Sequence, residues 1–349
     1  MNKTNLLLTS LLAFLFLGCT GKTPVVSSPR VTVPASQTVQ IPQHVQSNVP
    51  SLGRPINAEN ERVPVYVPPK HRVEFKAGES YVRKKFKLPS ALEESSGLIK
   101  VDNKLWTMND SGGKPELYQI DERRGGIVKT FRVNNASNRD WEDIAYDDNY
   151  VYIGDFGNNR GNSKALKIYK IPRAALRSQK SARAEVIRFS YSDQKDFRSR
   201  PRKTNYDCEA MVAYHGKLYL FSKDWGDHKT RLYELSETAG KQVARYISTF
   251  NTQGMVTGAS MNKELDILIL TTYSSLLNVN LWVFKNFRGE NFFSGDYKKL
   301  HLHNPLAGQI EGVTFTDNYK AYLSSEAFSK YIFSFDAALY SLDFSREFE

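Results

Sequence analysis

From about residue 80 to the C-terminus, apolar residues come in short runs separated by Gly, Asp, Asn and Pro. Runs such as Leu105–Met108 and Val151–Ile153 combine aliphatic and aromatic residues, as β-strands do. No stretch of any length shows the 3.6-residue repeat of an amphipathic helix. The pattern therefore predicts an all-β domain.

Five segments of this region repeat one order of features. Each has a small or acidic residue, a short apolar strand, a turn with Asp or Asn, a second strand that ends in polar residues, and a third strand of Tyr-x-Leu/Ile/Phe character. The repeats begin at Ser96, Glu142, Glu209, Thr257 and Glu311, and we expect their third strands at Leu117–Ile120, Ile168–Ile171, Leu232–Leu235, Leu281–Phe284 and Tyr331–Phe333.

A further strand-like run follows each of the first four repeats. These runs are Ile127–Val133, Glu185–Tyr191, Val243–Phe250 and Tyr297–Leu302. A repeating unit of four antiparallel strands is typical of a β-propeller blade. The fifth repeat lacks such a run, but Tyr81–Leu88 precedes the first repeat, so we predict that this N-terminal strand completes the last blade and closes the ring. The count is five blades, or six if one blade is degenerate.

The N-terminus carries a different signal. The apolar run Leu6–Leu17 follows Lys3 and is too short to span a bilayer as a helix. Phe16-Leu17-Gly18-Cys19 resembles the lipobox of bacterial lipoproteins. The resemblance implies a signal peptide over residues 1–18 and acylation of Cys19, for instance with palmitate. Thr20 stands where an aspartate would favour retention in the inner membrane, so we expect an outer-membrane lipoprotein on the periplasmic or surface face.

We predict that residues 19–70 form a tether and that residues 71–349 form the propeller domain. The tether is rich in Pro, Ser, Val, Gln and Asn, and proline favours extended conformations. Once Cys19 is acylated, Cys208 has no partner within the chain, so we expect no disulfide and a buried Cys208.

The formal net charge of +11 raises the question of an anionic partner. Much of the excess lies between Pro172 and Asp207, and no nucleic-acid motif accompanies it. We interpret this segment as a solvated basic loop, with contact to anionic lipid or a phosphate-rich polymer as the alternative. Nucleic acid is excluded as a partner, and we expect a monomer.

Carboxylates recur at equivalent places in the repeats. Because the first strand of each blade lines the channel of a propeller, Glu142, Glu209 and Glu311 are expected in one ring, with Ser96 and Thr257 in the remaining places. A second set, Asp110, Asp155, Asp224 and Glu326, lies about fourteen positions later in the repeats. Carboxylates gathered in this way suit a hard cation such as Ca²⁺.

The alternative is turn chemistry, because acidic and amide residues beside Gly, as in Asn109–Gly113, often bond to nearby backbone donors. On the metal hypothesis, the residues divide into two groups. The candidate metal ligands are Glu142, Glu209, Glu311, Asp110 and Asp155, and the candidate ligand-binding residues are Asp224, Glu326 and Asn109.

Four motifs also carry a family resemblance. Ser96-Gly97-Leu98, Asn109–Gly113, Asp140–Ala145 and Gly154–Arg160 resemble those of secreted bacterial propellers related to the esterase-like-activity-of-phytase and SMP-30/gluconolactonase-like groups. The similarity covers roughly Phe75 to the C-terminus. It implies a channel-mouth calcium that binds phosphate esters or lactones, and it nominates the same five metal ligands.

Two functions remain open on this basis. The sequence favours a membrane-anchored propeller that binds a partner or polymer of the cell envelope, because no nucleophile elbow, P-loop or His-Glu-x-x-His motif is present. The alternative is a calcium-dependent hydrolase of an ester, lactone or phosphate ester, with a channel carboxylate as base.

Overall fold

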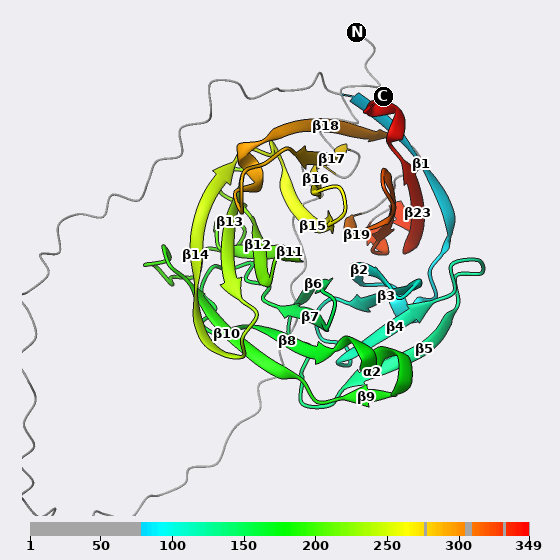
Figure 1. Cartoon of the computed structure of the whole chain (residues 1–349), viewed down its shortest axis with the longest axis horizontal. Helices are drawn as coiled ribbons and strands as arrows, with labels where there is room; N and C mark the ends of the chain where they lie inside the picture. Colours follow the sequence, from blue (N-terminus) through cyan, green and yellow to red (C-terminus); the bar gives the residue numbers. More distant parts are fainter. Residues whose placement is uncertain (1–77, 276–277, 304–308, 331–332, 349) are drawn as a thin grey trace, which may run out of the picture. The chain divides into compact units, whose positions relative to one another are not determined.

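The short apolar runs form strands throughout the part of the chain that the computed structural model describes. This part comprises residues 78–348 without 276–277, 304–308 and 331–332. The predicted signal peptide, the predicted acylation site Cys19 and the predicted tether of residues 19–70 lie outside the described residues. Figure 1 shows the strands arranged around a centre, with β2, β6, β11, β15 and β19 innermost.

The strands form five blades of four strands each, and pairing at the outer edges joins some of the blades into larger sheets. Blade 1 holds β2 (Ser95–Val101), β3 (Lys104–Asn109), β4 (Glu116–Ile120) and β5 (Ile127–Val133), and blade 2 holds β6 (Trp141–Tyr146), β7 (Tyr150–Asp155), β8 (Leu166–Pro172) and β10 (Glu185–Tyr191). Blade 3 holds β11 (Asp207–Tyr214), β12 (Lys217–Lys223), β13 (Thr230–Ser236) and β14 (Gly240–Phe250), and blade 4 holds β15 (Met255–Asn262), β16 (Ile267–Ser275), β17 (Asn278–Lys285) and β18 (Asp296–His303). Blade 5 holds β19 (Ile310–Asp317), β20 (Lys320–Ser325), β23 (Ala338–Asp343) and β1 (Gly78–Lys87). The chain is a five-bladed β-propeller.

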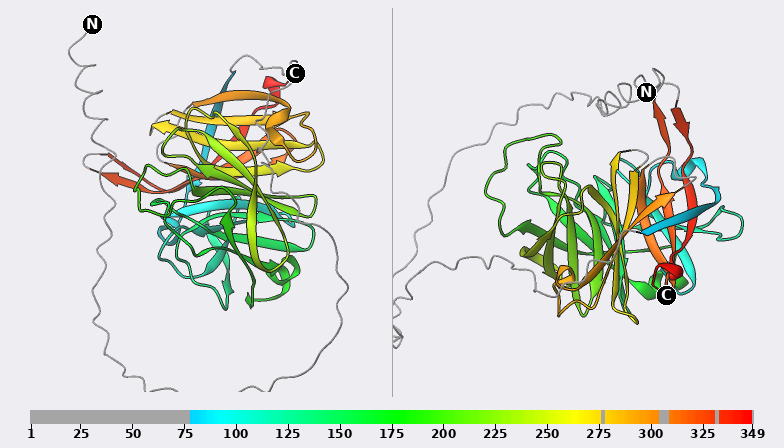
Figure 2. Two further views of the ribbon diagram at one scale, coloured as in Figure 1. Left: turned by 90° about the vertical axis from the view of Figure 1, so that its left-hand side faces the viewer. Right: turned by 90° about the horizontal axis from the view of Figure 1, so that it is seen from above.

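The N-terminal strand closes the ring as predicted. β1 pairs antiparallel with β23, from Val82 opposite Leu342 to Lys87 opposite Ala338. The third strand of blade 5 was placed wrongly, at Tyr331–Phe333. That place belongs to β23, whose Tyr340-Ser341-Leu342 has the same Tyr-x-Leu character. The segment between β20 and β23 carries a separate hairpin of β21 (Phe328–Lys330) and β22 (Phe333–Phe335), which projects from one face of the propeller (Figure 2).

Neighbouring blades are also linked at their outer edges. β10 pairs in parallel with β14, and β18 pairs in parallel with β1. The two-residue strand β9 (Ser181–Ala182) pairs in parallel with β5. These ladders satisfy backbone groups that outer strands would otherwise leave open for association with other chains.

The hydrophobic core is divided among the five interfaces between blades. Because successive residues of a strand point to opposite faces, each blade supplies two adjacent interfaces: Ile153 packs between blades 1 and 2, and Tyr152 packs between blades 2 and 3. Cys208 is fully buried between blades 2 and 3, as expected. The other interfaces join blades 3 and 4, blades 4 and 5, and blades 5 and 1.

The interpretation of the basic segment as one loop is corrected by the structure. It contains the helix α2 (Arg173–Ser178), β9 and the outer strand β10, and only residues 192–206 form a long loop. The remaining helical pieces are short turns, η1 (Ser90–Leu92), η2 (Phe292–Ser294) and η3 (Ser345–Glu347). In the described part of the chain no helix has the length and apolar character to cross a membrane.

If β1 holds the ring together, a cavity beneath it must destabilise the whole domain. Val82 on β1 is 3% exposed and packs into the core between blades 4 and 5. We predict that Val82→Ala lowers the free energy of unfolding by about 2 kcal/mol, because two buried methyl groups are lost. The matched control is Val128→Ala on β5, where the side chain is 55% exposed. Urea denaturation should place this control within about 0.5 kcal/mol of the parent chain; equal effects of the two substitutions would contradict the role of β1.

Candidate metal centre at the channel mouth

A β-bulge recurs at the start of the inner strand of every blade. The ladder between the first and second strands skips one residue on the first strand each time. The skipped residues are Gly97, Glu142, Glu209, Thr257 and Glu311. A bulge leaves its extra residue outside the ladder and re-aims the side chain. The structure thus brings the three predicted glutamates to equivalent positions, but the first blade has Gly97 there, one residue beyond the Ser96 of our alignment.

Three carboxylates of blades 1 and 2 form the closest group. Asp110 follows β3, Asp140 precedes β6, and Glu142 occupies the bulge of β6. One oxygen from each of them lies within 4.8 Å of the other two. Glu142 is only 4% exposed. We call this group, Asp110, Asp140 and Glu142, the acidic triad.

Gly157 makes room for the acidic triad. A Cβ atom at this position would lie 2.0 Å from Oε1 of Glu142 and 2.3 Å from Oδ2 of Asp140, closer than real contacts allow. Gly157 stands two residues beyond Asp155, just as Asp110 stands two residues beyond Met108, which holds the equivalent place on β3. Blade 2 therefore has a glycine where blade 1 has a carboxylate.

The carboxylates of blades 3 and 5 are satisfied by neighbours. Nζ of Lys223 lies 2.9 Å from Oε2 of Glu209, and both side chains are at most 6% exposed. Nε2 of Gln309 donates to Oε1 of Glu311 at 3.2 Å and to Oε2 of Glu326 at 3.0 Å. This half of the channel mouth thus has donors of its own, whereas the acidic triad faces like charges.

Burial and mutual repulsion raise the pKa of all three carboxyl groups of the acidic triad. Burial, followed by Glu326, Glu209 and Asp140, raises the pKa of Asp110 to about 9. Burial and the charge of Asp207 raise the pKa of Asp140 to about 6. For Glu142, burial and then Glu209 raise the pKa well above its usual range. Ionising the acidic triad without a cation is therefore costly.

The same forces act on the neighbouring carboxyl groups. Burial raises the pKa of Glu209 to about 8, although Lys223 opposes the shift, and burial raises that of Glu326 to about 7. The carboxylates around Lys223 outweigh its burial, so its pKa is raised and the ammonium stays charged.

Two residues of this region were not predicted as site residues. Asp140 belongs to the acidic triad, and Asp207 accepts hydrogen bonds from the backbone N–H of Asn158 at 2.6 Å and from Nε1 of Trp225 at 2.7 Å. A signal for both was present in the sequence: Asp140-Trp141-Glu142, Asp207-Cys208-Glu209 and Gln309-Ile310-Glu311 repeat an acid or amide two residues before each bulge glutamate.

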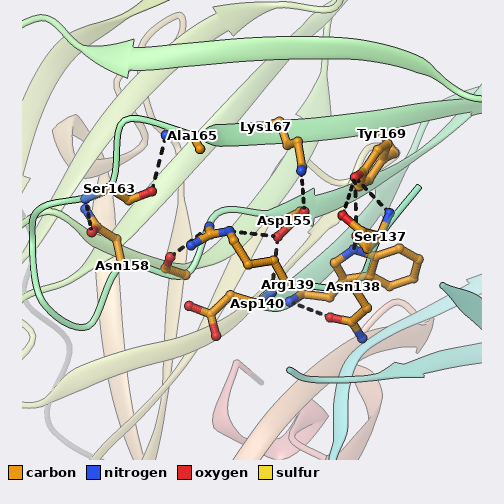
Figure 3. A network of polar contacts seen from close by, with 12 residues as sticks. Ser137, Asn138, Arg139, Asp140, Asp155, Asn158, Ser163, Ala165, Lys167 and Tyr169 are labelled. Atoms are coloured by element: carbon orange, nitrogen blue, oxygen red, sulfur yellow. Dashed lines mark hydrogen bonds and ion pairs between the residues drawn. The ribbon is translucent and has the colours of Figure 1, made fainter. Parts of the chain in front are cut away.

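Asp155 was predicted as a metal ligand, but the structure places it among cations. It is still inside β7, directly opposite Lys167 of β8, and its Oδ2 lies 3.1 Å from Nζ of Lys167. Nε of Arg139 lies 3.5 Å from its other oxygen. Figure 3 shows Asp155 between these two side chains, with the carboxylate of Asp140 directed to the side opposite Lys167. Asp155 therefore belongs to a network of ion pairs beside the acidic triad.

Asp224 and Asn109, predicted as ligand-binding residues, also have local partners. Asp224 forms an ion pair with Arg231 across neighbouring strands and is fully buried. Nδ2 of Asn109 donates to the carbonyl of Ala91 at 2.8 Å. The structure thus gathers Asp110, Glu142, Glu209, Glu311 and Glu326 at one mouth and leaves Asp155 and Asp224 in ion pairs.

The acidic triad fits a hard cation by three tests. Its donors are all carboxylate oxygens, which Ca²⁺ prefers. Oδ1 of Asp110 is buried and has no hydrogen-bond partner among the described residues. Gly157, where a Cβ atom would lie 2.0 Å from Oε1 of Glu142, leaves space beside the Glu142 carboxylate. Asp110, Asp140 and Glu142 are therefore the residues that would hold a metal.

Comparisons with known proteins add little to this geometry. No protein-family model matches the chain, and no curated protein matches it. Solved structures that resemble it include the hydrazine synthase of Kuenenia stuttgartiensis, with 12% identity and a TM-score of 0.36 over 69% of this chain and 57% of that one. A second is a mitotic checkpoint complex, with 12% identity and a TM-score of 0.33 over 70% of this chain and 60% of that one. The chain thus spans less than two thirds of the length of either.

The raised pKa values predict how stability depends on pH in the absence of metal. A carboxyl group whose pKa is higher in the folded state stabilises the fold below its unfolded pKa and loses that contribution as the pH rises through the folded value. With folded values of about 6 for Asp140, 7 for Glu326, 8 for Glu209 and 9 for Asp110, the free energy of unfolding should fall from about pH 4 to pH 9, and most steeply below pH 6, where all four groups contribute. The slope should be about 1.4 kcal/mol per pH unit for each group that is ionised in the unfolded chain and still protonated in the folded one.

Thermal denaturation with a chelator measures this dependence. Glu142→Gln should make the melting temperature fall less steeply with pH, because one buried charge is removed. Glu185→Gln, which removes a carboxylate whose side chain is 59% exposed on β10, should leave it unchanged. A melting temperature that rises from pH 6 to pH 9 would contradict the predicted coupling.

Proposed function

We propose that this propeller binds a divalent cation, calcium by its ligand chemistry, at the acidic mouth of its channel. The acidic triad carries this proposal, because three carboxylates lie within 4.8 Å of one another and their pKa values are raised. A divalent cation would remove the repulsion that burial makes expensive. Oxygen-only donors favour Ca²⁺ over the transition metals, which prefer imidazole or thiolate ligands.

We further propose that the bound cation presents open positions to an anionic ligand of the cell envelope. Ca²⁺ takes six to eight oxygen ligands, more than three carboxylates supply unless all bind through both oxygens. Basic side chains border the mouth, since the loop of residues 192–206 is held against the loop that follows β7. The backbone N–H of Arg200 donates to the carbonyl of Arg160 at 2.8 Å, and that of Arg202 donates to the carbonyl of Asn159 at 3.0 Å. Cationic side chains beside a metal support binding of a carboxylate- or phosphate-bearing polymer.

The proposed location is the outer membrane, with the propeller carried by acylated Cys19 and the tether of residues 19–70. This part of the proposal is supported by the lipobox-like Phe16-Leu17-Gly18-Cys19 and by the proline-rich sequence that follows it. An anchored domain meets envelope polymers at high local concentration, which suits a weak metal-dependent contact.

The second candidate function is calcium-assisted hydrolysis of an ester, lactone or phosphate ester. It is favoured by carboxyl groups with pKa values near neutral, about 7 for Glu326 and about 8 for Glu209, because such groups exchange protons readily at physiological pH. A bound Ca²⁺ would polarise the substrate's oxygen. The resemblance of the sequence to the phytase-like and gluconolactonase-like propellers also supports the hydrolase as a candidate function.

Calcium binding is tested by calorimetric titration of residues 71–349. We predict one Ca²⁺ per chain, and an affinity at least about tenfold lower in Glu142→Gln or Asp110→Asn, because each substitution removes one charged ligand. Glu185→Gln is the control for loss of a carboxylate elsewhere. Absence of binding, or binding that is indifferent to both triad substitutions, would refute the proposal. Calcium-dependent release of p-nitrophenol from its acetate or phosphate ester, lost in Glu142→Gln, would select the hydrolase over the binding protein.

Acylation is tested by substituting Cys19 in a bacterial host. Cys19→Ser should move the protein from the membrane fraction to the soluble fraction and should abolish incorporation of labelled palmitate, because the thiol is the only proposed attachment point. Cys208→Ser is the control, since this thiol is buried in the domain. A Cys19→Ser protein that still labels and sediments with membranes would contradict the proposed anchor.

A further inference from the structure

The opposite end of the channel, formed where the inner strands end, holds a cavity of about 650 Å³. All five blades line it, with apolar wall residues that include Leu98, Ile144, Met211, Ala259 and Phe315. Such a volume lies within the range of small-molecule sites. The cavity combines this apolar wall with a polar rim that includes Asp148, Arg173 and Lys263.

This cavity is separate from the acidic triad. Asp143, the residue after the bulge glutamate of blade 2, is fully buried and lies between the two ends of the channel. Its Oδ2 accepts a hydrogen bond from the N–H of Met211 at 2.7 Å, and its Oδ1 accepts one from the N–H of Ile144 at 2.8 Å. The side chain of Asp143 thus joins blades 2 and 3 across the channel.

The inner strands around the cavity are joined to one another by side chains. The inner strands β2, β6, β11, β15 and β19 each stand at the edge of a sheet, so one side of each is unpaired. Side chains of the next blade already use part of this side: the N–H of Lys100 donates to Oγ1 of Thr314 at 3.0 Å, and the N–H of Phe315 donates to Oγ of Ser260 at 3.2 Å.

Two cations from different blades meet at one aromatic ring on the rim. Nζ of Lys263, after β15, and Cζ of Arg173, at the start of α2, each lie 5.7 Å from the centre of the Tyr146 ring. Arg173 is paired with Asp102 at 2.6 Å. Nζ of Lys263 donates to the carbonyl of Tyr146 at 3.4 Å, and none of the ion pairs among the described residues includes Lys263. Burial lowers the pKa of Lys263, and Arg173 lowers it further, although Asp148 and Asp147 oppose the shift. An anion beside Lys263 would relieve this repulsion.

We infer that this cavity is a second binding site, which takes a small organic anion whose apolar body lies against the five inner strands and whose charged group pairs with Lys263. The site is independent of the metal proposed at the other mouth. Its polar end holds Lys263 and Arg173 over Tyr146 together with the acidic residues Asp148, Glu264 and Asp317, and Met211 lies in its wall.

Two fluorescent probes with the same aromatic body test the site. 8-Anilinonaphthalene-1-sulfonate carries a negative charge, and N-phenyl-1-naphthylamine carries none. We expect saturable binding of both to the native domain with one site each, unchanged by a chelator. Lys263→Met should lower the affinity for the sulfonate probe by about tenfold or more, because a charge-assisted contact is lost. The affinity for the neutral probe should not change. Lys241→Met, on the exposed face of the outer strand β14, is the matched control.

A second variant tests the cavity itself. Ser260 is half-buried and lines the cavity, so Ser260→Trp should fill it and abolish binding of both probes, with circular dichroism confirming that the variant is folded. Competition by decanoate, but not by decanol, should show that the site requires an anion. The inference fails if the sulfonate does not saturate, if Lys263→Met affects both probes equally or neither, or if a folded Ser260→Trp domain binds both like the parent.

Discussion

The antiparallel ladder between β1 and β23 is the constraint on which the rest of the molecule depends. It joins strands from opposite ends of the described chain, Val82 opposite Leu342 and Lys87 opposite Ala338. Each blade buries its two faces against its neighbours, so the five interfaces form only if the ring is complete. The closed ring also encloses the channel. Carboxylates from blades 1, 2, 3 and 5 lie together at its mouth because the ring is closed. No disulfide assists this closure within the described residues, where Cys208 is free and buried.

The acidic mouth is stable because its charges are divided between two arrangements. On the side of blades 3 and 5, Lys223 and Gln309 supply donors to Glu209, Glu311 and Glu326. On the side of blades 1 and 2, burial raises the pKa values of the acidic triad, so these groups hold protons or require a cation. Protons and a cation compete for the same oxygens. A site of this kind loses stability as it deprotonates and regains it when it binds metal.

Much of the fold could be predicted because strand, turn and repeat are local signals. The fourth strands were predicted with bounds that β5 and β10 reproduce, and the closing strand was predicted from the missing fourth strand of the last repeat. The third strand of blade 5 was misplaced because the hairpin of β21 and β22 interrupts that repeat with a similar aromatic sequence. Repeat counting alone cannot tell an inserted strand from a blade strand, since both have the same alternation of residues.

The site was predictable only in part, because a side chain's direction depends on register. Glu142, Glu209 and Glu311 are found in equivalent bulges, as the repeats suggested. Asp155 was grouped with Asp110 by its distance along the chain, yet it remains inside β7 and faces Lys167 on the next strand. Asp140 was passed over although it stands two residues before Glu142, and alternate residues of an extended segment point to the same side. The strand register thus decides which acids share a site.

The two ends of the channel differ because the inner strands all run in one direction around it. Their first residues carry the bulges and the acids, while their last residues are mainly apolar and end in turns with charged residues such as Asp148 and Lys263. Asp143 lies between these ends. Its side chain accepts hydrogen bonds from the backbone N–H groups of Met211 and Ile144, which an apolar side chain would leave unsatisfied. Because this cross-channel contact is fully buried, a cation at one mouth and an organic anion at the other would each meet a complete binding surface without sharing a residue.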